Sequence, residues 1–154
     1  MQLSKYFTLS EMIKSDTAER LKIDNTPYPR HIKAMRALCA NLLDPIRDAV
    51  GRPLHVTSGY RCRALNTAVN GSRNSQHLRG EAADIHVKGM TPRELYDFIL
   101  TLNLDFDQII DEFGEWVHIS YTEKRPNRKQ ALEARRVRGR EVFNEFYINP
   151  KTTL

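Results

Sequence analysis

The chain has 154 residues, of which 40% are hydrophobic and 28% are charged, values that exclude a disordered or fibrous protein. Its two cysteines, Cys39 and Cys62, are far apart and match neither a disulfide framework nor a cysteine-based metal motif. No stretch is long and apolar enough to span a membrane, and the N-terminal residues lack the apolar core of a signal peptide. We therefore expect a single folded domain over residues 1–154.

The formal net charge is +5, and much of the excess lies in residues 123–140, where eight Lys or Arg accompany two Glu. A basic segment of this kind is most often a solvated surface, but it can also bind nucleic acid or a negatively charged cell wall. The segment has no interleaved aromatic residues and no recognisable nucleic-acid motif. We therefore expect no nucleic-acid partner.

The N-terminal part, about 8–50, is predicted to be helical. Thr8-Leu9-Ser10-Glu11 has the form of a capping box and predicts a short helix that ends before Asn25-Thr26-Pro27. From Pro29 the apolar residues recur at near-helical spacing up to Gly51, which predicts a long helix that is kinked or interrupted at Pro45. These apolar residues are Ile32, Met35, Leu38, Leu42, Leu43, Ile46 and Val50.

The remaining elements are mostly strands. The expected elements are a strand over 54–58, a loop with a short helix over 59–71, a strand over 82–87, a helix from Thr91 to about Leu102, and two strands within 107–121 around a turn at Phe113-Gly114. Beyond Asn127, the segments 130–137 and 140–147 are either a hairpin turning at Arg138-Gly139 or partly helical. Helices gather early and strands late, which predicts an α+β fold with a mostly antiparallel sheet flanked by helices. The core would span about 54–122, and a basic C-terminal segment about 123–154.

The stretch "SQHLRGEAAD", residues 75–84, places His77 and Asp84 seven residues apart with small residues between them. Small residues allow a ligand or another part of the backbone to approach closely, and Gly80 permits a turn that other residues resist. A third metal ligand can come from His118, which is predicted to lie on the polar face of its strand, or from His86, two residues after Asp84. Two imidazoles and one carboxylate suit Zn²⁺ with a position left open for water. The spacing alone does not choose between His86 and His118.

The sequence contains three motifs in a recognisable order. "SQHLRGEAAD" fits S-x-H-x-x-G-x-A-x-D, "EWVH" (115–118) fits the E-x-x-H that follows it, and "SGYRCRALN" (58–66) stands upstream. Together they resemble the zinc D-alanyl-D-alanine carboxypeptidase family, which includes phage L-alanyl-D-glutamate endolysins and shares its fold with the hedgehog signalling domain. The resemblance covers roughly residues 30–135 and implies a hedgehog/DD-peptidase-like α+β fold.

The resemblance implies a role for each matching residue. The implied zinc ligands are His77, Asp84 and His118; the implied acid/base is Glu115; the implied substrate and transition-state contact is Arg61; and the implied cleft residues are Ser75 and Gln76. His86 has no ligand counterpart and becomes a neighbour of the site.

Strand geometry adds a condition to this assignment. Glu115 is three residues from His118, so it faces the same side only if it lies in the turn before the strand. Asp111 and Glu112 are the alternatives for the base. Trp116 shares the face of His118 and is either a wall of the cleft or a core residue, and we place it with the substrate-binding residues.

The resemblance implies a zinc-dependent peptidase that hydrolyses peptidoglycan stem peptides, either as a D-Ala-D-Ala carboxypeptidase or as an L-Ala-D-Glu endopeptidase. We expect one Zn²⁺ per chain, a monomer, and a phage endolysin-type enzyme made in the cytoplasm and acting on the cell wall. The alternative is a non-catalytic, zinc-stabilised binding module like the hedgehog domain.

Overall fold

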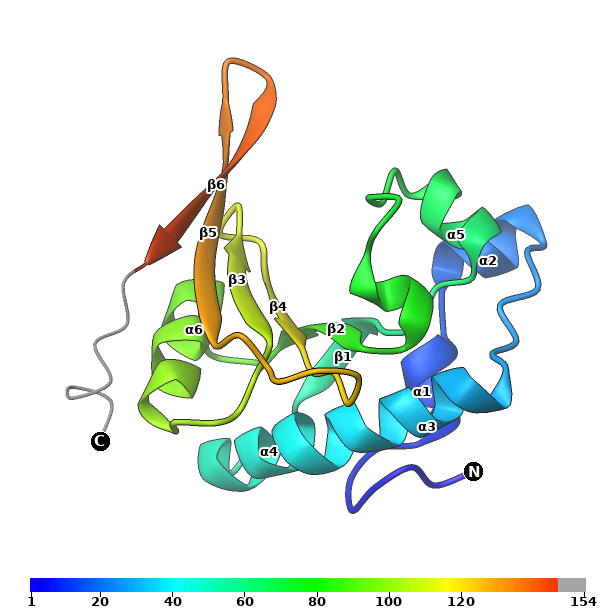
Figure 1. Cartoon of the computed structure of the whole chain (residues 1–154), viewed down its shortest axis with the longest axis horizontal. Helices are drawn as coiled ribbons and strands as arrows, with labels where there is room; N and C mark the ends of the chain where they lie inside the picture. Colours follow the sequence, from blue (N-terminus) through cyan, green and yellow to red (C-terminus); the bar gives the residue numbers. More distant parts are fainter. Residues whose placement is uncertain (147–154) are drawn as a thin grey trace.

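The computed structural model describes residues 1–146 and has a six-stranded sheet with helices packed on one of its faces (Figure 1). The strands are β1 (His55–Ser58), β2 (Ala82–His86), β3 (Gln108–Glu112), β4 (Trp116–Ser120), β5 (Gln130–Val137) and β6 (Arg140–Phe146), in the spatial order β1-β2-β4-β3-β5-β6. All neighbouring strands are antiparallel except β3 and β5. The α+β class expected from the sequence is confirmed. No helix within residues 1–146 combines the length and the apolar character needed to cross a membrane.

The predicted N-terminal helix is two short helices, α1 (Leu9–Ile13) and α2 (Asp16–Leu21). The capping box at Thr8 and Glu11 opens α1 as expected. Lys14 then takes an extended conformation, with ψ at 136°, and ends the helix. The side chain of Ser15 accepts a hydrogen bond from the backbone N–H of Ala18 and starts a second helix.

The predicted long helix runs without a break through α3 (Pro29–Leu38), the π-helical turn η1 (Cys39–Leu43) and α4 (Asp44–Val50). The N–H of Asp44 donates to the carbonyl of Cys39, five residues back. Pro45 has no N–H to place in the α-helical ladder, and the widened turn lies directly before it. The predicted interruption at Pro45 therefore takes the form of a π turn.

The segments beyond Asn127 form the hairpin β5–β6 rather than helix. Its turn is at Arg138 and Gly139, whose positive φ angles of 53° and 78° suit the tight turn of a two-residue hairpin. Tyr147, which the sequence placed in the second strand, lies outside the described residues. The remaining elements, α5 (Arg63–Ala68), the 3₁₀ turn η2 (Gln76–Arg79) and α6 (Pro92–Thr101), match the expected short helix, metal motif and Thr91-capped helix.

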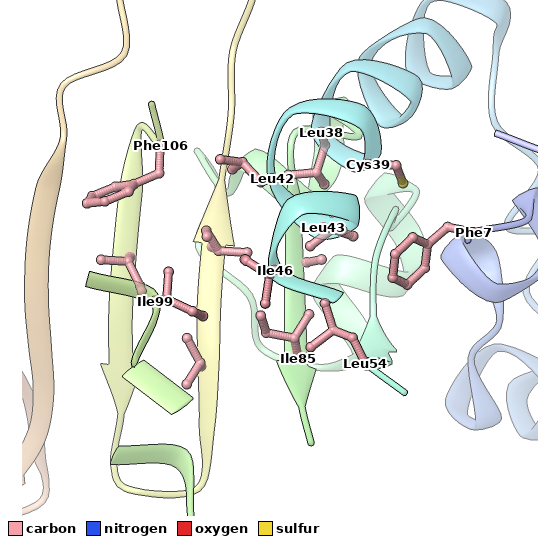
Figure 2. Packing of buried hydrophobic residues seen from close by; sticks show 14 of the residues in the cluster. Phe7, Leu38, Cys39, Leu42, Leu43, Ile46, Leu54, Ile85, Ile99 and Phe106 are labelled. Carbon is pink, nitrogen blue, oxygen red and sulfur yellow. The ribbon is translucent and has the colours of Figure 1, made fainter. Parts of the chain in front are cut away.

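The two faces of the sheet have different roles. Ile85 points toward the helices, where Ile46 and Ile99 lie in the same buried core (Figure 2). Val117 and Ile119 of the neighbouring strand belong to this core as well. Because side chains alternate along a strand, the residues between these positions point to the opposite face. The register pairs Asp84 of β2 with His118 of β4 on that face. The core thus fixes the sheet from one side and leaves the other side for the site.

Candidate metal centre and cleft

His77, Asp84 and His118 meet on the face of the sheet opposite the helices. His77 comes from η2, while Asp84 and His118 are cross-strand partners of β2 and β4. One nitrogen or oxygen atom from each of them lies within 4.8 Å of the others, and all three residues are buried. No other group of three or more His, Cys, Asp or Glu residues in the described part of the chain has this arrangement.

The separations between these atoms fit a zinc ion. Oδ1 of Asp84 lies 3.3 Å from Nε2 of His77 and 3.2 Å from Nδ1 of His118. Ligands held at about 2.0–2.1 Å from one tetrahedral Zn²⁺ are about 3.3 Å apart. Two imidazoles and a carboxylate therefore stand at the spacing that the ion requires, and three protein ligands leave a fourth position for water or substrate.

The orientation of His77 is set by the backbone of Gly59. Nδ1 of His77 lies 2.6 Å from the carbonyl oxygen of Gly59, and since a carbonyl only accepts, Nδ1 carries the proton and Nε2 is free to bind a metal. Gly59 itself is packed so tightly that a Cβ there would lie 2.3 Å from the backbone oxygen of Met12. A glycine is thus needed to bring this carbonyl to the ring.

Gly80 explains the small residues between the first two ligands. It ends η2 with a φ of +74°, and an added Cβ would lie 2.6 Å from the carbonyl oxygen of His31 in α3. The turn from His77 into β2 therefore depends on glycine for both its conformation and its packing. Because of this close turn, His77 and Asp84 meet at one site although they are seven residues apart in the sequence.

Asp84 is held in the charged form that a metal needs. Burial alone would raise the pKa of its carboxyl, but the charges and hydrogen bonds of His77 and His118 outweigh burial and hold the pKa below its usual range. Nη2 of Arg61 lies 3.5 Å from the second carboxylate oxygen. Arg61 is itself fixed by Ser58, which accepts from Nε at 3.0 Å, and by Asn66, which accepts from Nη1 at 3.1 Å.

A cleft of about 630 Å³ opens over this centre, a size in the usual range for ligand pockets, about 300–1,000 Å³. Arg61, His77, Asp84 and His118 lie along it. One side is the polar loop of residues 69–75 between α5 and η2, and the other side is built from β3 and the hairpin β5–β6.

Glu112, and not Glu115, lies in this cleft. Glu112 pairs with Trp116 across the β3–β4 turn, so it is on the His118 face, and its Oε1 lies 3.7 Å from Nδ1 of His118. Burial raises the pKa of Glu112 to about 7; the Asp84 carboxylate adds to this rise, while His118 and Arg61 oppose it. Its side chain is 19% exposed.

Glu115 lies in the turn before β4, as the sequence required for it to reach the metal, but it points elsewhere. Its side chain is 52% exposed and accepts a hydrogen bond of 3.0 Å from Nη1 of Arg136, and it does not line the cleft. Asp111 is on the core face of β3, where it accepts from the backbone N–H of Gly114 and from Arg93. Of the three carboxylates considered for the base, only Glu112 faces the ligands.

The residues expected to bind substrate all line the cleft. Ser75 uses its hydroxyl to accept from the backbone N–H of His77 and so caps η2. Gln76 donates to Asp107 at 3.0 Å, and its buried Oε1 has no hydrogen-bond partner among the described residues. Trp116 is a cleft residue rather than a core residue, and its ring meets Phe113 edge to face.

The other histidines lie away from the centre. His86 is exposed and stacks on His55 with the ring centroids 5.0 Å apart. His31 is buried in α3, where it accepts from the N–H of Tyr28 and contacts Tyr60. The structure therefore brings His118, and not His86, to His77 and Asp84.

Asp107, which the motifs do not mark, connects the cleft to the loop after β4. Its carboxylate is fully buried and accepts from Gln76, from two nitrogens of Arg125 and from the side chain and backbone of Arg128. Arg128 in turn lines the cleft. The only local signal for this network is the pairing of one acidic residue before β3 with a basic loop before β5, and such a signal is weak.

Comparison with known proteins agrees with this geometry. No curated protein matches the sequence. The model of the family described as peptidase M15 matches residues 5–120, which include the three candidate ligands, Arg61 and Glu112 but not the hairpin β5–β6. The chain therefore belongs to the peptidase M15 family of D-Ala-D-Ala carboxypeptidase-like zinc peptidases.

Proposed function

We propose that this protein is a zinc peptidase that hydrolyses peptide bonds in the stem peptides of peptidoglycan, as an enzyme of the phage endolysin type acting on the cell wall. The observation that carries the proposal is the convergence of His77, Asp84 and His118 at ligand spacing in an open cleft. The neighbouring Arg61 and Glu112 supply the charged groups that hydrolysis needs in addition to a metal. The peptidoglycan substrate is supported by the order of the "SGYR", "SQHLRGEAAD" and "EWVH" motifs.

Zn²⁺ held by His77, Asp84 and His118 would polarise the carbonyl of the bound peptide and lower the pKa of a water molecule at the open position. The proton transfers are carried out by a side chain of the protein. The Glu112 carboxylate accepts the proton of the attacking water and then delivers it to the nitrogen of the leaving amine.

Arg61 balances the negative charge that develops on the carbonyl oxygen. Three of its five N–H groups contact Ser58, Asn66 and Asp84, and these contacts fix the plane of the guanidinium. Among residues 1–146 the two remaining N–H groups have no partner, so a substrate oxygen can accept from them. A donor held in place before the reaction stabilises such charge most effectively.

The test is to measure zinc per chain and to incubate the zinc-loaded protein with purified peptidoglycan, followed by mass spectrometry of the released fragments. We expect about one zinc per chain and fragments whose new ends identify one peptide bond. Removal of zinc with a chelator should abolish release, and added zinc should restore it. A protein that holds zinc but releases no fragment from peptidoglycan would instead be a zinc-stabilised binding module.

A further inference from the structure

The hairpin β5–β6 forms a wall of the cleft although it lies outside the residues that match the family. Leu132, Arg136, Glu141 and Phe143 of the hairpin line the cleft together with the metal ligands. Figure 1 shows the hairpin extending beyond the rest of the sheet, on the side opposite α5 and its following loop. Phe143 is 52% exposed, so its ring is accessible to a molecule bound in the cleft.

The cleft face of this wall carries the apolar side chains of Leu132 and Phe143 beside the charged side chains of Arg136 and Glu141. Alternation along β5 puts Leu132, Ala134 and Arg136 on the cleft side, and Phe143 pairs with Ala134. Ile110, Leu132 and Ala134 form a small buried cluster against which Phe113 packs. The facing loop of residues 69–75 is rich in amide and hydroxyl groups. A peptide between the two would meet hydrogen-bonding groups on one side, and both apolar and charged groups on the other.

The wall joins the metal-bearing part of the sheet through the pairing of β5 with β3, and Arg136 adds side-chain contacts. Its guanidinium carbon lies 3.9 Å from the centre of the Phe113 ring, and its Nη1 donates to Glu115 at 3.0 Å. Both partners belong to the turn between β3 and β4, directly before the strand that carries His118. The ion pair between Arg136 and Glu115 therefore links the hairpin to the turn before β4.

The size of the wall sets the length of the substrate. Between β4, which carries His118, and β6, which carries Phe143, lie β3 and β5, so the two strands are three strand spacings apart. At about 4.8 Å for each spacing this distance is about 14 Å, which is the length of about four residues of an extended peptide. A dipeptide at the metal would leave the wall uncovered.

We propose that the hairpin β5–β6 is a substrate-binding wall, and that the enzyme acts on peptides with about four residues on one side of the cleaved bond rather than on free dipeptides. This inference rests on the proposed peptidase function and adds the substrate class. The occupant is the substrate chain itself, because the wall is continuous with the metal centre.

Trp116 is the single tryptophan of the chain and lines the cleft, so its fluorescence reports binding there. The zinc-loaded Glu112→Gln protein should be titrated with a synthetic stem pentapeptide and with the dipeptides of its two ends. We expect the pentapeptide to bind at least about tenfold more tightly than either dipeptide, and Phe143→Ala to reduce this ratio by about 3- to 10-fold, the scale of one aromatic contact. In the cleaving enzyme, Phe143→Ala should raise KM for the pentapeptide more than it lowers kcat.

Val142→Ala is the matched control, because Val142 is an exposed apolar residue of the same strand that does not line the cleft. It should leave the binding ratio unchanged, and both variants should keep wild-type zinc content and thermal stability. Equal binding ratios in Phe143→Ala and wild type would overturn the inference, as would a dimer that Phe143→Ala dissociates in sedimentation experiments. Failure of the wild type to cleave any peptide would refute the proposed function, while the binding ratios would still decide the role of the hairpin.

Discussion

Glu112 and Glu115 are three residues apart and provide a direct test of which carboxylate moves protons. Glu112→Gln keeps the shape of the side chain and removes the group that accepts a proton from water. The loss of a general acid/base lowers the rate by about 10²- to 10⁴-fold, and we expect kcat to fall within this range. Zinc content should stay at the wild-type value, because Glu112 is not one of the three candidate ligands and its Oε1 lies 3.7 Å from Nδ1 of His118.

Glu115→Gln is the matched variant and should behave differently. The change weakens an exposed ion pair with Arg136, and such pairs are worth about 0.2–1 kcal/mol. Because this ion pair links Glu115 to the hairpin, we expect a modest rise in KM for a long peptide, of a few-fold, and little change in kcat. Glutamine can still accept a hydrogen bond from Arg136, so part of the contact remains.

The assay should compare both variants on the same stem peptide at saturating concentration, with zinc measured in each sample. A Glu115→Gln enzyme that loses about 10²-fold in kcat, beside a Glu112→Gln enzyme of normal rate, would refute the reasoning from the cleft geometry. It would mean that the hairpin moves when substrate binds and that Glu115 leaves Arg136 to face the metal.

Three further predictions concern the ligands, the cleft arginine and the buried aspartate. His118→Ala should lose most of the bound zinc in metal analysis, whereas His86→Ala should retain it, because His86 stacks on an exposed neighbour away from the centre. Arg61→Lys should fold and bind zinc but lose at least about tenfold in kcat/KM, because an ammonium cannot reproduce the planar guanidinium contacts. Asp107→Asn should lower the free energy of unfolding at pH 7 by about 2 kcal/mol, less than the 3–5 kcal/mol of a fully buried pair, because both arginine partners are half exposed. The folded-state pKa of Asp107 is held below its unfolded value by Arg128 and Arg125 despite burial. In denaturation experiments the difference in unfolding free energy between the wild type and Asp107→Asn should therefore have its full value above about pH 4 and decrease as the pH falls further.

Elements with local signals could be predicted from the sequence. The capping boxes at Thr8 and Thr91 mark true helix starts, and the Phe113-Gly114 turn separates two true strands. The order of the strands could not be predicted, because the parallel pairing of β3 with β5 depends on the course of the loop between β4 and β5. Lys14 ends the first helix through a backbone conformation that most residues can adopt, so its sequence carries no signal for the break.

The candidate metal ligands could be predicted for a similar reason. His77 and Asp84 lie within one short motif whose glycine fixes the turn between them. Strand alternation leaves both His86 and His118 as the third ligand, and the resemblance of "EWVH" to E-x-x-H selects His118. The position of Phe143 beside the cleft could not be predicted from the sequence. Its place beside the cleft follows only when β5 has been placed next to β3, and exposed apolar residues in a basic hairpin have no specific meaning in sequence alone.

The position of Glu112 in the cleft could be predicted from the sequence only in part. The E-x-x-H spacing draws attention to Glu115, but an odd spacing on a strand puts the two side chains on opposite faces. The turn of residues 113–115 pairs Glu112 with Trp116, and since Trp116 and His118 are two residues apart, all three share one face. Once the three-residue turn is known, alternation alone places Glu112 beside the metal ligands. In this hairpin, cross-strand register therefore places Glu112 on the face of the candidate metal ligands, whereas linear spacing from His118 points to Glu115.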